Sequence, residues 1–155
     1  MASALSVEHF GSRFKMAAYD HDPCATTATL CSPDGGTTIR YFDGKELRKF
    51  GVIAKPTVVG GGGLTKVEIV ASATTAFSSV TVIKDSGTVA ADALDDYVFL
   101  ECTAEEVAHL AASGGVDLRY VAARLTNATE TDEVAVVYIG EPIREYSGLT
   151  ATTIA

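Results

Sequence analysis

The clearest pattern of hydrophobic and polar positions lies between residues 97 and 139, where strand and helix signals follow one another without a break. Residues 97–102 alternate with a period of two, as expected for a strand that packs one face on a core. The predicted inner face consists of Val98, Leu100 and Cys102, and the outer face of Tyr97, Phe99 and Glu101. We therefore predict a half-buried strand in which Cys102 is a buried core thiol.

A short helix is predicted directly after this strand. Thr103 stands three residues before Glu106, which is the capping-box spacing: the hydroxyl accepts from an orphan backbone amide, and the glutamate reaches back to the cap residue. Apolar residues then recur at helical spacing over residues 107–111, and Gly114-Gly115 supplies a left-handed stop. We predict one helix over residues 104–112.

Two further extended runs follow, at residues 116–126 and 133–139, with the polar segment 127–132 between them. Both are rich in Val, Leu, Tyr and Ile, which favour strands. Their proximity predicts an antiparallel hairpin, in which Val134, Val136 and Tyr138 share one face.

A second hairpin is predicted near the start of the chain. The dipeptide Asp43-Gly44 separates extended runs at residues 37–42 and 45–53, and a two-residue type I′ turn needs positive φ at both positions. Its basic residues are Arg40, Lys45, Arg48, Lys49 and Lys55. These residues fit two interpretations equally: contact with an acidic partner, including a neighbouring copy, or a solvated strand face.

The remaining pattern divides the chain into three regions. Strand signals recur at residues 65–71, 80–84 and 88–91, and Gly60 to Gly63 is interpreted as a flexible junction before them. The first 35 residues and the tail after Gly140 lack sustained periodicity and are predicted to be arms. We predict an N-terminal arm with a basic hairpin at 1–63, a β-rich body at 64–140 and a C-terminal arm at 141–155. The predicted fold class is mainly β: an antiparallel β sandwich or jelly-roll-like body with one short α-helix and extended terminal arms.

Charge narrows the classes of partner. The net charge is -8, and its distribution is uneven: residues 1–63 carry seven Lys or Arg against six Asp or Glu, whereas residues 64–155 carry five against fourteen. Nucleic-acid binding needs clustered cations, so an acidic body argues against it. A solvated acidic face is favoured over a surface for a basic partner. No run approaches the length of a membrane span, and no secretory signal is recognisable, so we expect synthesis in the cytoplasm and no membrane partner.

Metal and cofactor chemistry is not predicted. His21, Cys24 and Cys31, with His9 as a possible fourth ligand, contain soft donors, but their spacing matches no compact zinc motif. The three cysteines are expected to be reduced thiols. The loop residues Asp92, Asp95 and Asp96 lack the closing glutamate of a calcium loop.

Catalytic signatures are also missing from the sequence. The run Gly60 to Gly63 lacks the Gly-Lys-Ser/Thr ending of a phosphate-binding loop. His109 has no indicated partner, and Glu105 and Glu106 are better explained by the helix N-terminus than by acid–base work. We therefore predict a protein that is not an enzyme.

A resemblance adds a functional expectation. The succession LTKVEIV, VTVIKDSGTVAADA, YVFLECTAEEVAHLA, LRYVAARLT and TDEVAVVYI, from Leu64 to Ile139, resembles small virion proteins of tailed bacteriophages. It covers about half of the chain, and its motifs are framework residues rather than site residues. The resemblance implies a non-enzymatic capsid decoration or cement protein on the capsid surface, with the major capsid protein as partner and a homotrimer as the assembly. The alternatives are a tail or neck component and a carbohydrate-binding β sandwich, although the chain has no Trp and six Tyr for aromatic platforms.

Overall fold

The computed structural model describes residues 15–21, 29–30 and 39–143, and these form a sandwich of two antiparallel sheets. The strands are β1 (Lys15–His21), β2 (Thr29–Leu30), β3 (Phe42–Asp43), β4 (Leu47–Val58), β5 (Leu64–Ser72), β6 (Thr81–Asp85), β7 (Val98–Thr103), β8 (Tyr120–Asn127) and β9 (Glu133–Pro142). A short 3₁₀ helix, η1 (Gly44–Glu46), precedes β4, and the α-helix α2 (Ala104–Gly114) follows β7. The predicted mainly β fold class, with a sandwich body and one short α-helix, is confirmed.

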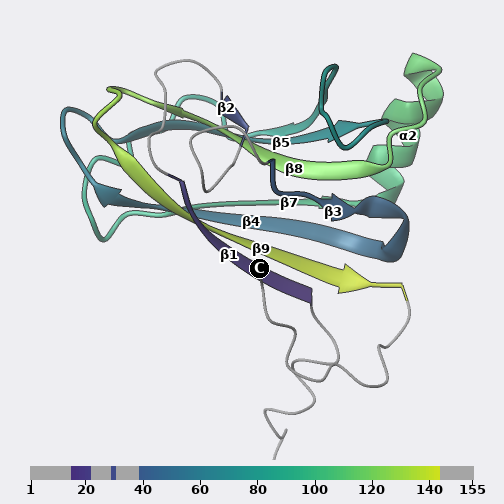
Figure 1. Cartoon of the computed structure of the whole chain (residues 1–155), viewed down its shortest axis with the longest axis horizontal. Coiled ribbons are helices and arrows are strands. Elements are labelled where there is room, and N and C mark those ends of the chain that lie inside the picture. The colour runs from purple at the N-terminus through teal and green to yellow at the C-terminus, as the bar shows by residue number, and fades with distance from the viewer. Residues whose placement is uncertain (1–14, 22–28, 31–38, 144–155) are drawn as a thin grey trace, which may run out of the picture.

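The sheets lie one above the other, with α2 at one end of the sandwich (Figure 1). Sheet A, the lower layer in the figure, has the strand order β1-β9-β4-β7, and sheet B has the order β2-β8-β5-β6, with β3 also paired to β8. Strands from both sides of residue 63 build this sandwich, since β4 lies at the centre of sheet A. The described residues therefore form one unit, and no boundary in the fold falls at the glycine run.

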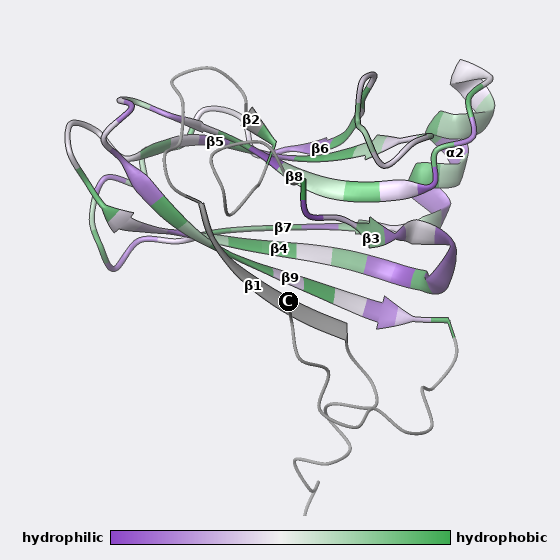
Figure 2. Ribbon diagram, viewed as in Figure 1, coloured by the Kyte–Doolittle hydropathy of each residue, from purple (hydrophilic) through white to green (hydrophobic). Residues whose placement is uncertain are grey.

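Alternation along the strands fills the space between the sheets, and it is visible as bands of hydropathy along β4 and β9 (Figure 2). Val52 and Ala54 of β4, and Val134, Val136 and Tyr138 of β9, are completely buried. Leu125 and Val67 face them from sheet B within the same core cluster. The face predicted for residues 134, 136 and 138 is thus confirmed.

The core is organised around three aromatic rings. Tyr138 meets Phe50 and Phe42 edge-on, with ring centroids 5.1 and 5.7 Å apart, and Phe42 meets Phe50 at 5.6 Å. The Tyr138 hydroxyl accepts a 2.7 Å hydrogen bond from the amide of Ala123 in β8 and donates to the carbonyl of Arg40. The side chain of Tyr138, in sheet A, therefore satisfies the amide of Ala123 in sheet B and the carbonyl of Arg40, which precedes β3.

Both predicted hairpins are wrong. β8 pairs with β5, β2 and β3 in sheet B, whereas β9 pairs with β1 and β4 in sheet A, so the intervening turn crosses from one sheet to the other. Likewise, β3 and β4 lie in different sheets, and Asp43 caps η1 by accepting from the amide of Lys45. Alternation identifies a strand and its buried face, but it does not specify which strand is the neighbour.

The ends of the chain also differ from expectation. Lys15–His21, predicted to belong to an arm, forms the edge strand β1 and pairs with β9. Residues 1–14, 22–28, 31–38 and 144–155 lie outside the described part, so the rest of both predicted arms is not described. The predicted strand at 88–91 is reduced to a bridge between Ala91 and Leu64.

The strand and helix predicted over residues 97–112 are confirmed. Val98 and Leu100 pack against the core and Cys102 lies within it, whereas Tyr97 and Phe99 are exposed. Thr103 and Glu106 form the complete capping box, and Gly115 ends α2 with φ of 65°. The helix docks through Val107 against the core, which offsets the low intrinsic stability of so short a helix.

We predict that Thr103→Ala lowers the free energy of unfolding by about 1 kcal/mol, because the amide of Glu106 loses its acceptor. Thr103→Ser keeps the hydroxyl and should retain most of that stability. Urea unfolding of the three proteins measures the difference. Identical midpoints would contradict the capping assignment.

Candidate interaction surface

The described titratable side chains serve mainly structural roles. Burial, aided by the nearby carboxylate of Glu106, raises the pKa of the Cys102 thiol to about 12, so this cysteine is protonated and unreactive at neutral pH. The prediction of a buried core thiol is confirmed. His9, Cys24 and Cys31 lie outside the described residues, and only the backbone of His21 is described, so the expectation that these four residues form no zinc site stays a prediction.

The aspartates of the 92–96 loop organise their own backbone. The Asp96 carboxylate accepts from the amides of Asp92 and Ala93 at 3.1 and 3.0 Å. Within the described ranges, no group of three or more His, Cys, Asp or Glu side chains is arranged to hold a metal ion. Nor is any described helix long and apolar enough to cross a membrane.

The glycine run and the 128–132 turn are joined by a buried carboxylate. One oxygen of Asp132 accepts from the amides of Gly60 and Gly61 at 2.6 and 3.2 Å, and the other accepts from the amide and the hydroxyl of Thr129, both at 2.9 Å. Asp132 is completely buried. The run therefore binds the neighbouring turn and is not the flexible junction that the sequence suggested.

Glycine is required in this run for two physical reasons. A Cβ at Gly61 or Gly62 would come within 2.8 Å of Thr129 or Ala128, respectively. Gly63 has φ of +67°, and a Cβ there would collide with the backbone of Ala91 and Asp92. The turn between β4 and β5 thus packs too closely for side chains.

Burial by itself would raise the pKa of Asp132, but the hydrogen bonds from Thr129, Gly60 and Gly61 outweigh it and hold the pKa below its usual range. Asn127 adds to the same junction by donating to the Asp132 carbonyl at 2.8 Å. Asn127-Ala128-Thr129 has the form of a glycosylation sequon. Because Asn127 is buried, its side chain is inaccessible in the folded chain as a glycosylation acceptor.

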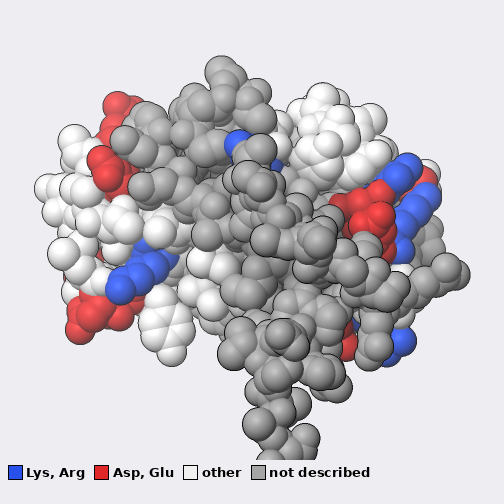
Figure 3. Space-filling model, turned by 60° about the horizontal axis from the view of Figure 1, so that its bottom comes forward, with Lys and Arg blue, Asp and Glu red and all other residues white. Residues whose placement is uncertain are grey.

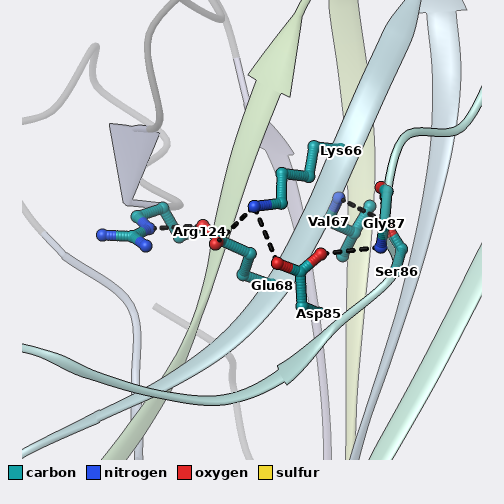
Figure 4. A network of polar contacts seen from close by, with 7 residues as sticks. All are labelled: Lys66, Val67, Glu68, Asp85, Ser86, Gly87 and Arg124. Carbon is teal, nitrogen blue, oxygen red and sulfur yellow. Dashed lines mark hydrogen bonds and ion pairs between the residues drawn. The ribbon is translucent and has the colours of Figure 1, made fainter.

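A second polar network crosses sheet B (Figure 4). Glu68, only 4% exposed, accepts from Arg124 at 2.6 Å and pairs with Lys66 at 3.0 Å, while Lys66 also pairs with Asp85 at 2.7 Å. Burial raises the pKa of Glu68, but Arg124 and Lys66 more than offset this and lower it. Glu68 is therefore held ionised, which suits a structural ion pair better than proton transfer.

The helix carboxylates are likewise explained by structure. Lys84 and the Thr103 amide hold Glu106, and the Lys84 contact is the main reason that its pKa is lowered. Glu105 and His109 line a groove of about 400 Å³ beside α2, together with Ile83 and Leu110. The assignment of Glu106 to capping is confirmed.

The outer face of sheet A carries the most prominent exposed aromatic residues. Phe99 and Tyr97 are 49% and 69% exposed, and neighbouring Leu94 is 56% exposed. In the strand register, Phe99 lies beside Ile53 of β4, which in turn lies beside Val137 of β9. These three side chains form an apolar row across the sheet.

Charged side chains flank this row on both sides. Lys55 is the next residue after Ile53 on the outer face of β4, and it lies on one side of the row. Glu101 lies opposite Gly51, on the other side of the row. Both are exposed, and neither makes an ion pair within the described part of the chain. We name this surface the Phe99 face, consisting of Ile53, Lys55, Tyr97, Phe99, Glu101 and Val137. Figure 3 turns sheet A toward the viewer and shows basic and acidic groups side by side at both ends of that side of the molecule.

The sequence pattern placed Tyr97, Phe99 and Glu101 on an outer face, but it could not show that β4 would supply Lys55 beside them. Asp132, Glu68 and the Tyr138 hydroxyl were missed as polar centres. Their only signal was a polar atom at or next to an otherwise apolar strand.

Comparison with known proteins does not assign a family. No protein-family model matches this sequence. A search of curated proteins likewise finds no match.

We predict that Gly63→Ala destabilises the fold by more than about 3 kcal/mol, because left-handed strain adds to a backbone collision. Gly87→Ala is the matched control: Gly87 has φ of +68°, but a Cβ there meets nothing within 4 Å. This control should cost only about 1 kcal/mol. Equal losses in denaturant unfolding would show that the glycine run is not tightly packed.

We predict that Asp132→Asn costs about 2 kcal/mol at pH 7, because charge-assisted hydrogen bonds are weakened. The folded-state pKa of Asp132 is lowered, so its stabilisation is complete above the unfolded pKa of about 3.9 and is lost as pH falls through the folded value. The difference in the free energy of unfolding between wild type and variant should therefore narrow as the pH falls below about 4. Urea unfolding across this range measures it.

Asp95→Asn, in an exposed loop, is the control for this series and should change stability by less than about 0.5 kcal/mol. An Asp132→Asn deficit that stays constant down to pH 2 would refute the assigned role of the carboxylate.

Proposed function

We propose that this chain is a non-enzymatic structural protein of a tailed-phage virion, a capsid decoration protein that binds the major capsid protein lattice. The resemblance of residues 64–139 to small virion proteins supports this proposal, and the strands β5 to β9 lie largely within that stretch. The described carboxylates also support it, because Glu68, Glu106 and Asp132 are held as structural acceptors.

One observation carries the proposal: the two terminal segments are attached at the same end of one strand pair. Lys15, the first residue of β1, pairs with Gly140, near the end of β9. Segments 1–14 and 144–155 therefore begin close together at one edge of sheet A. Two segments anchored at one place can engage one partner surface together.

Such an arrangement suits a protein that recognises an assembled lattice. Two weak contacts joined through a rigid body raise each other's effective concentration, so binding depends on both sites being presented together. A protein that binds only the assembled shell stabilises that shell by mass action, without chemistry. The acidic body between the two segments, with four Lys or Arg against thirteen Asp or Glu over residues 64–143, is then left facing solvent.

We predict that removing residues 1–14 weakens binding to preassembled shells at least about tenfold, because joint engagement of two segments is lost. The truncation stops before β1, so its melting temperature should change little. Co-sedimentation with shells that lack the protein, at matched concentration and salt, measures binding. Replacement of residues 1–14 by an equally long Gly/Ser segment separates sequence from length.

The same samples distinguish the alternatives. A protein that ignores shells but decorates tails would be a neck or tail component. A protein that binds neither and retains a glycan would be a carbohydrate-binding module, and either result would overturn the decoration proposal.

A further inference from the structure

The Phe99 face carries one basic and one acidic residue that lie too far apart to pair with each other within one chain. Glu101 lies opposite Gly51, four residues before Lys55 on the same strand face. At about 3.4 Å per residue, Lys55 and Glu101 are therefore about 14 Å apart along the sheet, with the Phe99–Ile53 row midway between them. An acidic group and a basic group thus lie at equal distances on either side of an apolar row.

This pattern is self-complementary about a two-fold axis. A second copy, packed face to face and turned about an axis along the Phe99–Ile53–Val137 row, places each residue of the row against its own equivalent. The row that holds Lys55 then faces the partner's row that holds Gly51 and Glu101. Every two-fold contact contains two such opposite-charge pairs, as expected for an isologous interface.

The local shape fits the same arrangement. Gly51 has no side chain, and the ring of Phe99 leans over it: a Cβ at Gly51 would lie 3.3 Å from the ring. The position facing Lys55 across the axis is therefore covered by the apolar Phe99 ring, with Glu101 beside it. An aliphatic lysine stem can pack there while its ammonium group reaches the carboxylate.

We propose that the Phe99 face is a contact between two copies of this chain, in which Lys55 of each copy pairs with Glu101 of the other across an apolar centre formed by Phe99 and Ile53. The contact spans only part of one sheet, whereas a standard interface covers about 800 Å² per partner. The contact is therefore weak, and the fraction of associated protein changes over the accessible range of concentrations. It also produces even-numbered assemblies, unlike the trimer implied by the virion-protein resemblance.

The test is a charge exchange followed by sedimentation velocity over a series of protein concentrations. Lys55→Glu and Glu101→Lys should each raise the dissociation constant about tenfold, because two pairs per contact become repulsive. The double variant Lys55→Glu/Glu101→Lys restores opposite charges and should return the constant to within about threefold of wild type. Glu130→Lys, at an exposed position of the 128–132 turn, makes the same change in net charge as Glu101→Lys away from the face and should leave association unaltered.

Melting temperatures establish that each variant is folded. Phe99→Ser should abolish association without unfolding the chain, because the ring is half-exposed. A wild-type protein that is monomeric at millimolar concentration would overturn the proposal. So would a trimer that is indifferent to these substitutions, or a double variant no better than the singles. None of these outcomes bears on shell binding, so the contact and the decoration function can fail separately.

Discussion

The sandwich depends on the hydroxyl of Tyr138, because it connects the two layers inside the core. Among the described strands, β2 pairs with β8 at Leu125 and Arg124, and β3 pairs with it at Val121 and Tyr120. These two strands leave a gap on that edge of β8 at Ala122 and Ala123. Tyr138 accepts from the Ala123 amide in this gap. An unpaired amide in the core would cost free energy comparable to a lost hydrogen bond. The ring that carries the hydroxyl also fills the core between Phe42 and Phe50.

Polar groups secure the ends of the sandwich in the same way. Asp132 joins the β4–β5 and β8–β9 turns at one end, and the Thr103 capping box fixes α2 at the other. At the α2 end, Arg119 donates twice to Asp43, which connects the start of β8 to η1. Each contact satisfies backbone or charged groups that the apolar core cannot, so the loops are fixed relative to the sheets.

The functional argument follows from this division between interior and surface. Within the described residues, the buried carboxylates of Glu68 and Asp132 hold the fold. The two most exposed aromatic side chains, Tyr97 and Phe99, lie with Lys55 and Glu101 on the outer face of sheet A. Surfaces that combine an apolar centre with flanking charges are typical of protein contacts. The proposed shell contact begins at the β1 edge of that sheet, while the proposed copy-to-copy contact is centred on β4 and β7.

The sequence by itself determined the local elements: the 97–102 strand with its two faces, the capped helix, the buried face of residues 134–138 and the mainly β class. Each of these features follows from residues only a few positions apart in sequence, through the alternation of a strand or the capping of a helix. The tertiary structure alone decided the pairing. It placed β8 and β9 in opposite sheets, used Asp43-Gly44 as a cap, and recruited Lys15–His21 as an edge strand. Strand alternation is the same for any neighbour, so partners are chosen by how whole faces fill the core, which no local pattern records. For the same reason, Lys55 and Glu101, 46 positions apart in sequence, became parts of one surface only through the β4–β7 register.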